Sequence, residues 1–186
     1  KPDYTPQYTF TSDPNKDGKV IHIDLEKLPH YYDELITVGE HLHYQRNLYR
    51  YYPVTPGLPP SGYEVLDNEN SNDNTLANIW RCFNASNGYC HSAGNVKTGL
   101  YYDVITDELD GGVSLNYDGG YGRWETHIQL ICNRSVPETK IDFDDVGVLV
   151  SNFNVPVIFA HTSMACLVDA PEPPTPAPVI FDRNSI

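Results

Sequence analysis

The sequence predicts an all-β domain of the sandwich or flattened-barrel type, and three observations support this prediction. The 186 residues include 14 Tyr, 15 Pro and 13 Gly, which favour strands and turns over long helices. This length is sufficient for one domain with a hydrophobic core. From residue 76 onward, short apolar runs alternate with turn residues at the spacing typical of these folds. The runs are IWRCF, GLYYDVI, VSLNY, THIQLIC, VGVLV and VPVIF.

The chain is predicted to divide into three parts. Residues 1–18 form an N-terminal extension, residues 19–168 form the β domain with a loop insertion at about 53–75, and residues 169–186 form a Pro-rich tail. Within the domain, residues 28–52 mix Tyr, His and charged residues without a regular stripe, so we expect short helical or irregular decoration there. The PEPPTPAP motif of the tail favours a stiff polyproline II segment.

The motif DPNKDG near the N-terminus has two interpretations. It marks the turn of a hairpin before the apolar run VIHIDL. Alternatively, it resembles a calcium loop, with possible ligands at Asp13, Asn15, Asp17 and Asp24 and a glycine at the sixth position. The preceding residues YTFTS favour a strand over the entering helix of such a loop, and Asp24 is shorter than the usual bidentate glutamate. We therefore expect no cofactor, with calcium as the alternative that this motif leaves open.

The charge of the chain excludes several classes of partner. There are 12 Lys and Arg against 25 Asp and Glu, so nucleic acid and anionic membrane surfaces would be repelled. No nucleophile elbow, phosphate-binding loop, dinucleotide fingerprint or zinc-protease motif occurs, and we expect no enzyme. Acidic clusters such as Asp142, Asp144 and Asp145 could act as a general acid and base, but in so acidic a chain they are usually solvated.

The cysteines and two sequons indicate the compartment. Four cysteines accompany the glycosylation motifs that begin at Asn84 and Asn133, a combination typical of the secretory lumen or the extracellular space. The chain has no apolar run of about 18 residues and no signal-like start, so we expect a processed soluble portion. A membrane anchor after Ile186 is left open.

Several motifs resemble the mannose 6-phosphate receptor homology family. These are LNYDGG from Leu115, IQLICNRS from Ile128 and FAHTSMAC from Phe159, with weaker similarity in NIWRCF, CHSAGN and IDLEKL. The resemblance covers about residues 20–168. It implies a flattened β-barrel of two antiparallel sheets. It also implies disulfides between Cys132 and Cys166 and between Cys82 and Cys90, while a third disulfide common in the family is absent; four free buried thiols are the alternative.

The family's sugar-binding motif is degenerate in this chain. Lectins of the family surround mannose with a Gln, an Arg, a Glu and a Tyr. The family spacing places Trp124 at the arginine position, with Arg123 one residue earlier on the opposite face of a strand. It places Pro156 at the tyrosine position, where no hydroxyl is available. Each lost hydrogen bond costs about 0.5–1.5 kcal/mol, so ordinary mannose binding should be weakened strongly.

Five residues remain as candidate ligand contacts in that pocket. They are Tyr117, Arg123, Trp124, Asp144 and Asp145, of which the two aspartates lie near the glutamate position. Trp124 equally fits a role in core packing, and Arg123 fits a solvated charge or an ion pair with a neighbouring acid.

The resulting hypothesis is a non-catalytic lumenal or extracellular domain used for protein interaction or structural assembly. Its partners would be proteins of a membrane-associated or extracellular assembly, and the Tyr-rich segments Tyr44–Tyr52 and Tyr101–Tyr102 would suit such contacts. The alternative is a lectin domain of a cargo-sorting receptor that binds mannose-type glycans through a rearranged pocket.

Overall fold

The computed structural model describes residues 5–40, 43–66, 76–83, 87–96, 99–105, 110–149, 155–171 and 176–178. These residues form strands joined by turns and two short 3-10 helices, η1 (Leu25–Lys27) and η2 (Ser163–Ala165). The strands are β1 (Thr9–Thr11), β2 (Lys19–Asp24), β3 (Tyr32–Glu40), β4 (His43–Tyr51), β5 (Glu64–Val65), β6 (Ile79–Phe83), β7 (Tyr89–Gly94), β8 (Leu100–Val104), β9 (Val113–Tyr117), β10 (Thr126–Cys132), β11 (Asp142–Phe143), β12 (Val146–Leu149), β13 (Pro156–Thr162) and β14 (Leu167–Asp169). The prediction of an all-β fold is confirmed.

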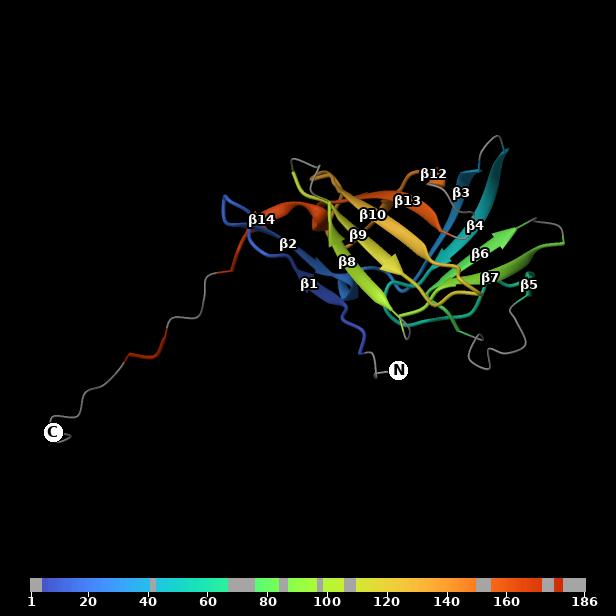
Figure 1. The fold of residues 1–186 in the computed structure, drawn as a ribbon, viewed down its shortest axis with the longest axis horizontal. Coiled ribbons are helices and arrows are strands. Elements are labelled where there is room, and N and C mark those ends of the chain that lie inside the picture. The colour runs from blue at the N-terminus through green and yellow to red at the C-terminus, as the bar shows by residue number, and fades with distance from the viewer. Residues whose placement is uncertain are drawn as a thin grey trace, which may run out of the picture.

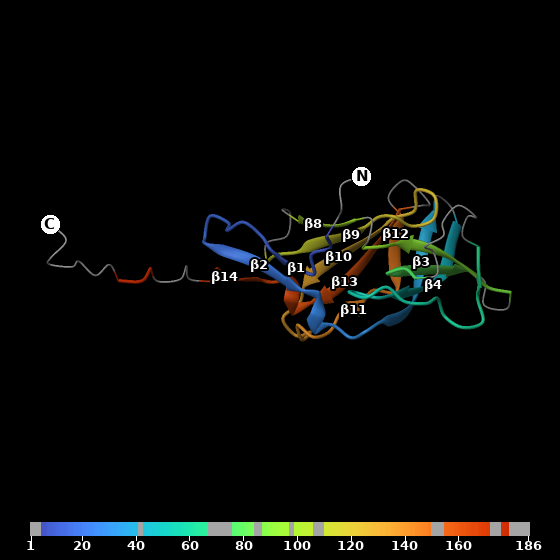
Figure 2. The same ribbon diagram turned by 90° about the horizontal axis from the view of Figure 1, so that it is seen from below.

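The strands belong to two sheets. A small sheet has the order β1-β2-β14, and a large one has the order β5-β7-β6-β4-β3-β12-β13-β10-β9-β8, with β11 paired to β13. Figures 1 and 2 show the small sheet toward one end of the long axis and β3 and β4 toward the other. The large sheet folds over on itself to enclose one main core, as a sandwich does.

The strand pairing differs from the expected purely antiparallel arrangement. Most pairs are antiparallel, but β10 with β13, β12 with β3, and β5 with β7 are parallel. Parallel neighbours require a long connection, and β10 is joined to β13 through β11, β12 and their loops. The described pairing leaves β5 and β8 as the ends of the large sheet, so the sheet path is open.

The expected helical or irregular decoration at residues 28–52 is wrong, because most of this segment forms strands. It forms β3 and β4, an antiparallel pair whose register runs from Tyr32 opposite Tyr51 to Glu40 opposite His43. Alternate residues of this pair face the core, where Ile36 is 1% exposed and Tyr49 is 2% exposed. The hairpin is therefore a central part of the large sheet.

The N-terminal hairpin occurs as expected, and β1 pairs with β2 in the small sheet. The side chain of Asn15 shapes its turn, because Asn15 Oδ1 accepts hydrogen bonds from the backbone N–H groups of Asp17 (3.0 Å) and Lys19 (2.8 Å). The loop at 53–66 packs on the outer face of β4 and β6, where Trp80 Nε1 donates to Gly57 O at 2.9 Å. The rest of the predicted insertion, residues 67–75, lies outside the described residues. Within the described part of the chain, no helix has the length and apolar character needed to span a membrane.

The main core joins both layers of the large sheet. Leu115, Ile128 and Leu130 are buried on β9 and β10, and each such side chain stabilises the fold by about 1.5–3 kcal/mol. Two buried tyrosines bridge the layers, with the hydroxyls of Tyr51 and Tyr117 2.7 Å apart and Tyr117 Oη donating to Pro53 O at 3.1 Å. Burial of polar hydroxyls is tolerated here because they are hydrogen-bonded.

These tyrosines predict a loss of stability at alkaline pH. Burial raises the pKa of Tyr49, Tyr51 and Tyr117 above the ordinary value of about 10. Above about pH 10 the unfolded chain releases these protons whereas the folded chain retains them, so the free energy of unfolding should fall as pH rises. Tyrosinate absorbance should rise for these residues only as the protein unfolds. A Tyr51→Phe, Tyr117→Phe double variant should show a shallower decline in stability, and an equally steep one would contradict the prediction.

Candidate ligand pocket beside Arg81

A polar cluster lies on the inner face of β4, β6 and β7. The cross-strand register places Arg81 between Tyr49 on one side and His91 on the other, and it places Phe83 opposite Tyr89. Cross-strand partners point to the same face of a sheet, so all five side chains lie together. Alternation along β4 adds Asn47 and Gln45 to this face.

Arg81 is the centre of the cluster and is fully buried, with 0% exposed surface. Its Nε donates to Asn47 Oδ1 at 2.9 Å. Its guanidinium carbon lies 5.0 Å from the ring centroid of Phe83 and 5.2 Å from that of Trp124, within the range of cation–π attraction. A guanidinium is expensive to bury unless such partners replace water, so its surroundings are specific for arginine.

Aromatic rings surround this guanidinium. Phe83 stacks on Tyr89 with ring centroids 5.2 Å apart, and His91 stacks on Tyr121 at 4.4 Å. Trp124 meets the His91 ring edge-on at 4.8 Å. The two layers of the sandwich therefore meet through aromatic contacts at this point.

The turn at 120–124 delivers Trp124 to the cluster. Tyr121 N donates to Ser92 O at 2.8 Å, and Gly120 N donates to Trp124 O at 3.0 Å. A Cβ atom at Gly120 would lie 2.6 Å from Ser92 O and 2.8 Å from the Cα atom of Ala93. Glycine thus permits the close approach of this turn to β7.

An open pocket of about 310 Å³ borders the cluster and is lined by Gln45, Arg46, Asn47, Phe83 and Tyr89. This volume falls in the usual range of small-ligand sites. Because Asn47 Oδ1 is engaged by Arg81, the Nδ2 group of Asn47 is left as the donor of that side chain. The pocket therefore combines two stacked rings with two side-chain amides and the side chain of Arg46.

The Tyr49 hydroxyl lies near Arg81 but does not line this pocket. It is buried and has no hydrogen-bond partner among the described residues. Burial raises the pKa of Tyr49, and the nearby Arg81 charge opposes that increase. The hydroxyl is consequently neutral across the physiological range and can act as donor or acceptor.

The structure separates the five residues predicted from the family motif. Trp124 joins the Arg81 cluster, while Arg123 is exposed in the preceding turn and Tyr117 is in the core. Asp144 Oδ1 lies 3.0 Å from His161 Nε2, and exposed Asp145 accepts a hydrogen bond from Thr37 N through its carbonyl oxygen. None of these five residues lines the pocket described above.

The pocket residues themselves were not predicted. They come from β4 and from two later, consecutive strands, β6 and β7, and no family motif marks Gln45, Asn47 or Tyr89. One signal was available, since an arginine interrupts the otherwise apolar strand IWRCF. A charged residue at such a position is rarely fully buried without a dedicated set of partners.

The predicted calcium ligands do not converge. Asn15 and Asp17 belong to the β1–β2 turn, whereas Asp24 lies at the far end of β2 opposite Thr9. The Asp24 carboxylate instead caps η1 by accepting from Glu26 N at 3.1 Å. Within the described residues, no group of three or more His, Cys, Asp or Glu side chains could hold a metal ion.

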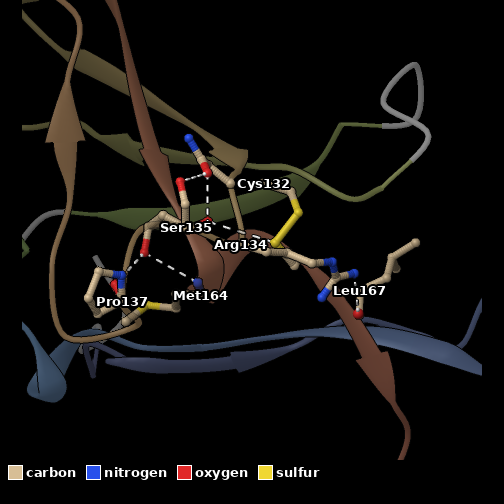
Figure 3. Close-up of a disulfide and its surroundings, with 9 residues drawn as sticks. Cys132, Arg134, Ser135, Pro137, Met164 and Leu167 are labelled. Atoms are coloured by element: carbon tan, nitrogen blue, oxygen red, sulfur yellow. Dashed lines mark hydrogen bonds between the residues drawn. A yellow bond between two sulfur atoms is a disulfide. The ribbon is translucent and has the colours of Figure 1, made fainter.

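Both predicted disulfides are confirmed. Cys82 pairs with Cys90 between β6 and β7, and Cys132 pairs with Cys166 between the end of β10 and the end of η2 (Figure 3). All four cysteines are thereby oxidised. The first disulfide holds together two of the strands that line the pocket. Of the predicted glycosylation sites, Asn133 is described, and Asn84 lies outside the described residues.

The chain was compared with protein-family models, curated proteins and solved structures. No protein-family model matches the chain. No curated protein matches it either. Among solved structures, the chain is similar to domain 11 of the echidna M6P/IGF2R receptor, solved as an NMR ensemble in solution, with a TM-score of 0.44 and 16% sequence identity. The match covers 87% of this chain and 97% of that one.

Proposed function

We propose that this chain is a non-catalytic, lectin-like domain that binds a glycan in the pocket beside Arg81. The observation that carries the proposal is the adjacency of the stacked pair Phe83 and Tyr89 to the amides of Gln45 and Asn47 around one open pocket. A sugar presents an apolar face, which packs on aromatic rings, and a rim of hydroxyls, which bond to amides. The family resemblance favours mannose-type glycans as the ligand.

The rings, the amides and the neighbouring Arg81 have distinct roles in this proposal. The rings of Phe83 and Tyr89 support the apolar face of the sugar, and Gln45 provides an exposed amide at the rim. Arg81 acts as a positioning residue, because its hydrogen bond to Asn47 fixes which end of that amide is available. A glycan would therefore meet groups that are already oriented, which reduces the entropy cost of binding.

The proposal is tested with a glycan array and isothermal titration on the soluble domain. Gln45→Ala should weaken binding by roughly 2- to 10-fold through loss of one hydrogen bond, and Tyr89→Leu should weaken it further through loss of stacking. Arg123→Ala is the matched control and should bind as the parent does, because Arg123 is exposed and outside the pocket. An array without specific binding, or binding lost only in Arg123→Ala, would contradict the proposal.

Protein interaction is the second candidate, supported by the outer face of β3 and the segment before it. Tyr31 is 45% exposed and Leu35 is 50% exposed. Arg50 holds Asp33 through two hydrogen bonds of 2.7 and 2.8 Å and lies 4.6 Å above the Tyr31 ring. Tyrosine and arginine are the residue types most common at interface hot spots.

Only part of the Tyr-rich sequence serves such an interface. Tyr49, Tyr51 and Tyr52 are buried, so these three tyrosines of the segment Tyr44–Tyr52 are not contact residues as expected, while Tyr101 is 52% exposed. A silent glycan array together with a stoichiometric partner that is lost in Leu35→Ser would support this second candidate. The two disulfides fit a lumenal or extracellular location for either function.

A further inference from the structure

The sequon that starts at Asn133 forms an ordered turn directly after β10. Asn133 Oδ1 accepts two hydrogen bonds, from the backbone N–H of Ser135 at 3.0 Å and from the Ser135 hydroxyl at 2.6 Å. Val136 N donates to Asn133 O at 3.1 Å and closes the turn. The Ser135 residue is exposed, whereas Asn133 is partly buried.

This geometry leaves the amide nitrogen of Asn133 available for reaction. Both bonds from Ser135 go to the carbonyl oxygen, so neither of them occupies Nδ2, which lies on the opposite side of Cγ from Oδ1. Arg134 does not cover it, because its Nη2 donates to Leu167 O at 3.3 Å and its side chain extends toward β14 (Figure 3).

We propose that Asn133 carries an N-linked oligosaccharide. Nδ2 forms a bond to the anomeric carbon of the first sugar of a polyisoprenyl pyrophosphate oligosaccharide, supplied with its transferase by the secretory pathway. The bond from that carbon to the pyrophosphate oxygen breaks, the pyrophosphate leaves with the electron pair, and one Nδ2 proton passes to a base of the transferase. The oxidised state of all four cysteines supports passage through the compartment where this transfer occurs.

The glycan would lie away from the ligand pocket. Thr126, the first residue of β10, bonds to Ala93 O on β7 at 2.8 Å, whereas Cys132 ends the strand beside the sequon. Six residue steps along an extended strand cover roughly 20 Å. The attachment point therefore lies at the opposite end of β10 from the contact with β7, and the proposal does not depend on the proposed glycan-binding function.

The test uses the full chain secreted from a eukaryotic cell line, with Asn84→Gln present to isolate one sequon. Intact mass before and after peptide N-glycosidase treatment should show loss of one oligosaccharide and conversion of Asn133 to Asp. Ser135→Ala should remove the modification, and the matched variant Ser135→Thr should keep it because the hydroxyl is retained. Disulfide mapping of each secreted protein verifies the fold.

Two results would overturn the proposal. One is an unmodified mass for the Asn84→Gln protein, whose sequon at Asn133 is intact and whose folding does not depend on any change there. The other is an oligosaccharide that persists in Ser135→Ala. Either result would assign the Ser135 hydrogen bonds to turn formation alone.

Discussion

Replacing Cys132 and Cys166 together with alanine should lower the free energy of unfolding by about 4 kcal/mol. The disulfide closes a loop with a sequence separation of 34, and the chain-entropy model gives this value for the freedom that the unfolded chain regains. In the folded state the bond ties β10 to the turn after β13, and Cys166 is 1% exposed. Since domains are stable by about 5–15 kcal/mol in total, the loss is a large share.

Urea unfolding of the parent and the double variant measures this loss. The matched control replaces Cys82 and Cys90 with alanine, where the separation is 8 and the same model gives about 2.5 kcal/mol. The order of the two losses is the decisive result. A greater loss from the shorter loop would show that local packing, and not the entropy of the unfolded chain, determines what the disulfides contribute.

The C-terminal half of the fold could be predicted because its strands carry their signals locally. The runs VSLNY and THIQLIC alternate inward and outward residues, and Val113, Leu115 and Ile128 are buried as this pattern indicates. The cysteine pairings followed from the family resemblance. Neither the local pattern nor the family resemblance predicted the parallel pairing of β10 with β13, because a local sequence pattern does not specify which distant strands pair.

The β3–β4 hairpin was not predicted because neither of its faces is uniformly polar or uniformly apolar. Its inner face includes the polar residues Glu34 and Asn47, and its outer face includes the apolar pair Leu35 and Leu48. Burial raises the pKa of Glu34, and the nearby Asp142 and Asp33 charges add to the increase. Keeping this carboxylate ionised on the inner face of the sheet therefore costs free energy. Functional surfaces commonly break the binary pattern in this way.

The candidate site could be predicted only in part, and Trp124 shows why. Its packing role was among the alternatives, and it is 8% exposed against Arg81. Arg81 lies 43 residues before Trp124 in the chain. That contact exists only after β6 and the 120–124 turn have been placed in opposite layers, a tertiary arrangement that residue spacing does not encode.

Arg81→Met should be among the most destabilising single substitutions in the domain, with a loss of about 3 kcal/mol. Methionine fills much of the volume, but it removes the donor from buried Asn47 Oδ1, and an unsatisfied buried acceptor costs about 1–3 kcal/mol. It also removes the cation–π contacts with Phe83 and Trp124, each contributing about 0.5–1 kcal/mol or more. Arg123→Met is the control, because Arg123 is exposed and outside the pocket and should change stability by less than about 0.5 kcal/mol.

A double-mutant cycle with Asn47→Leu separates the hydrogen bond from the rest of the loss. The Asn47→Leu, Arg81→Met protein lacks both polar groups, so no buried donor or acceptor is left without its partner. The double variant should therefore be more stable than the sum of the two single losses indicates. Glycan binding should nevertheless remain weak, because the oriented amide has gone from the pocket. Additive losses in stability would mean that Arg81 and Asn47 act independently, and the assignment of Arg81 as the residue that positions the pocket would then be wrong.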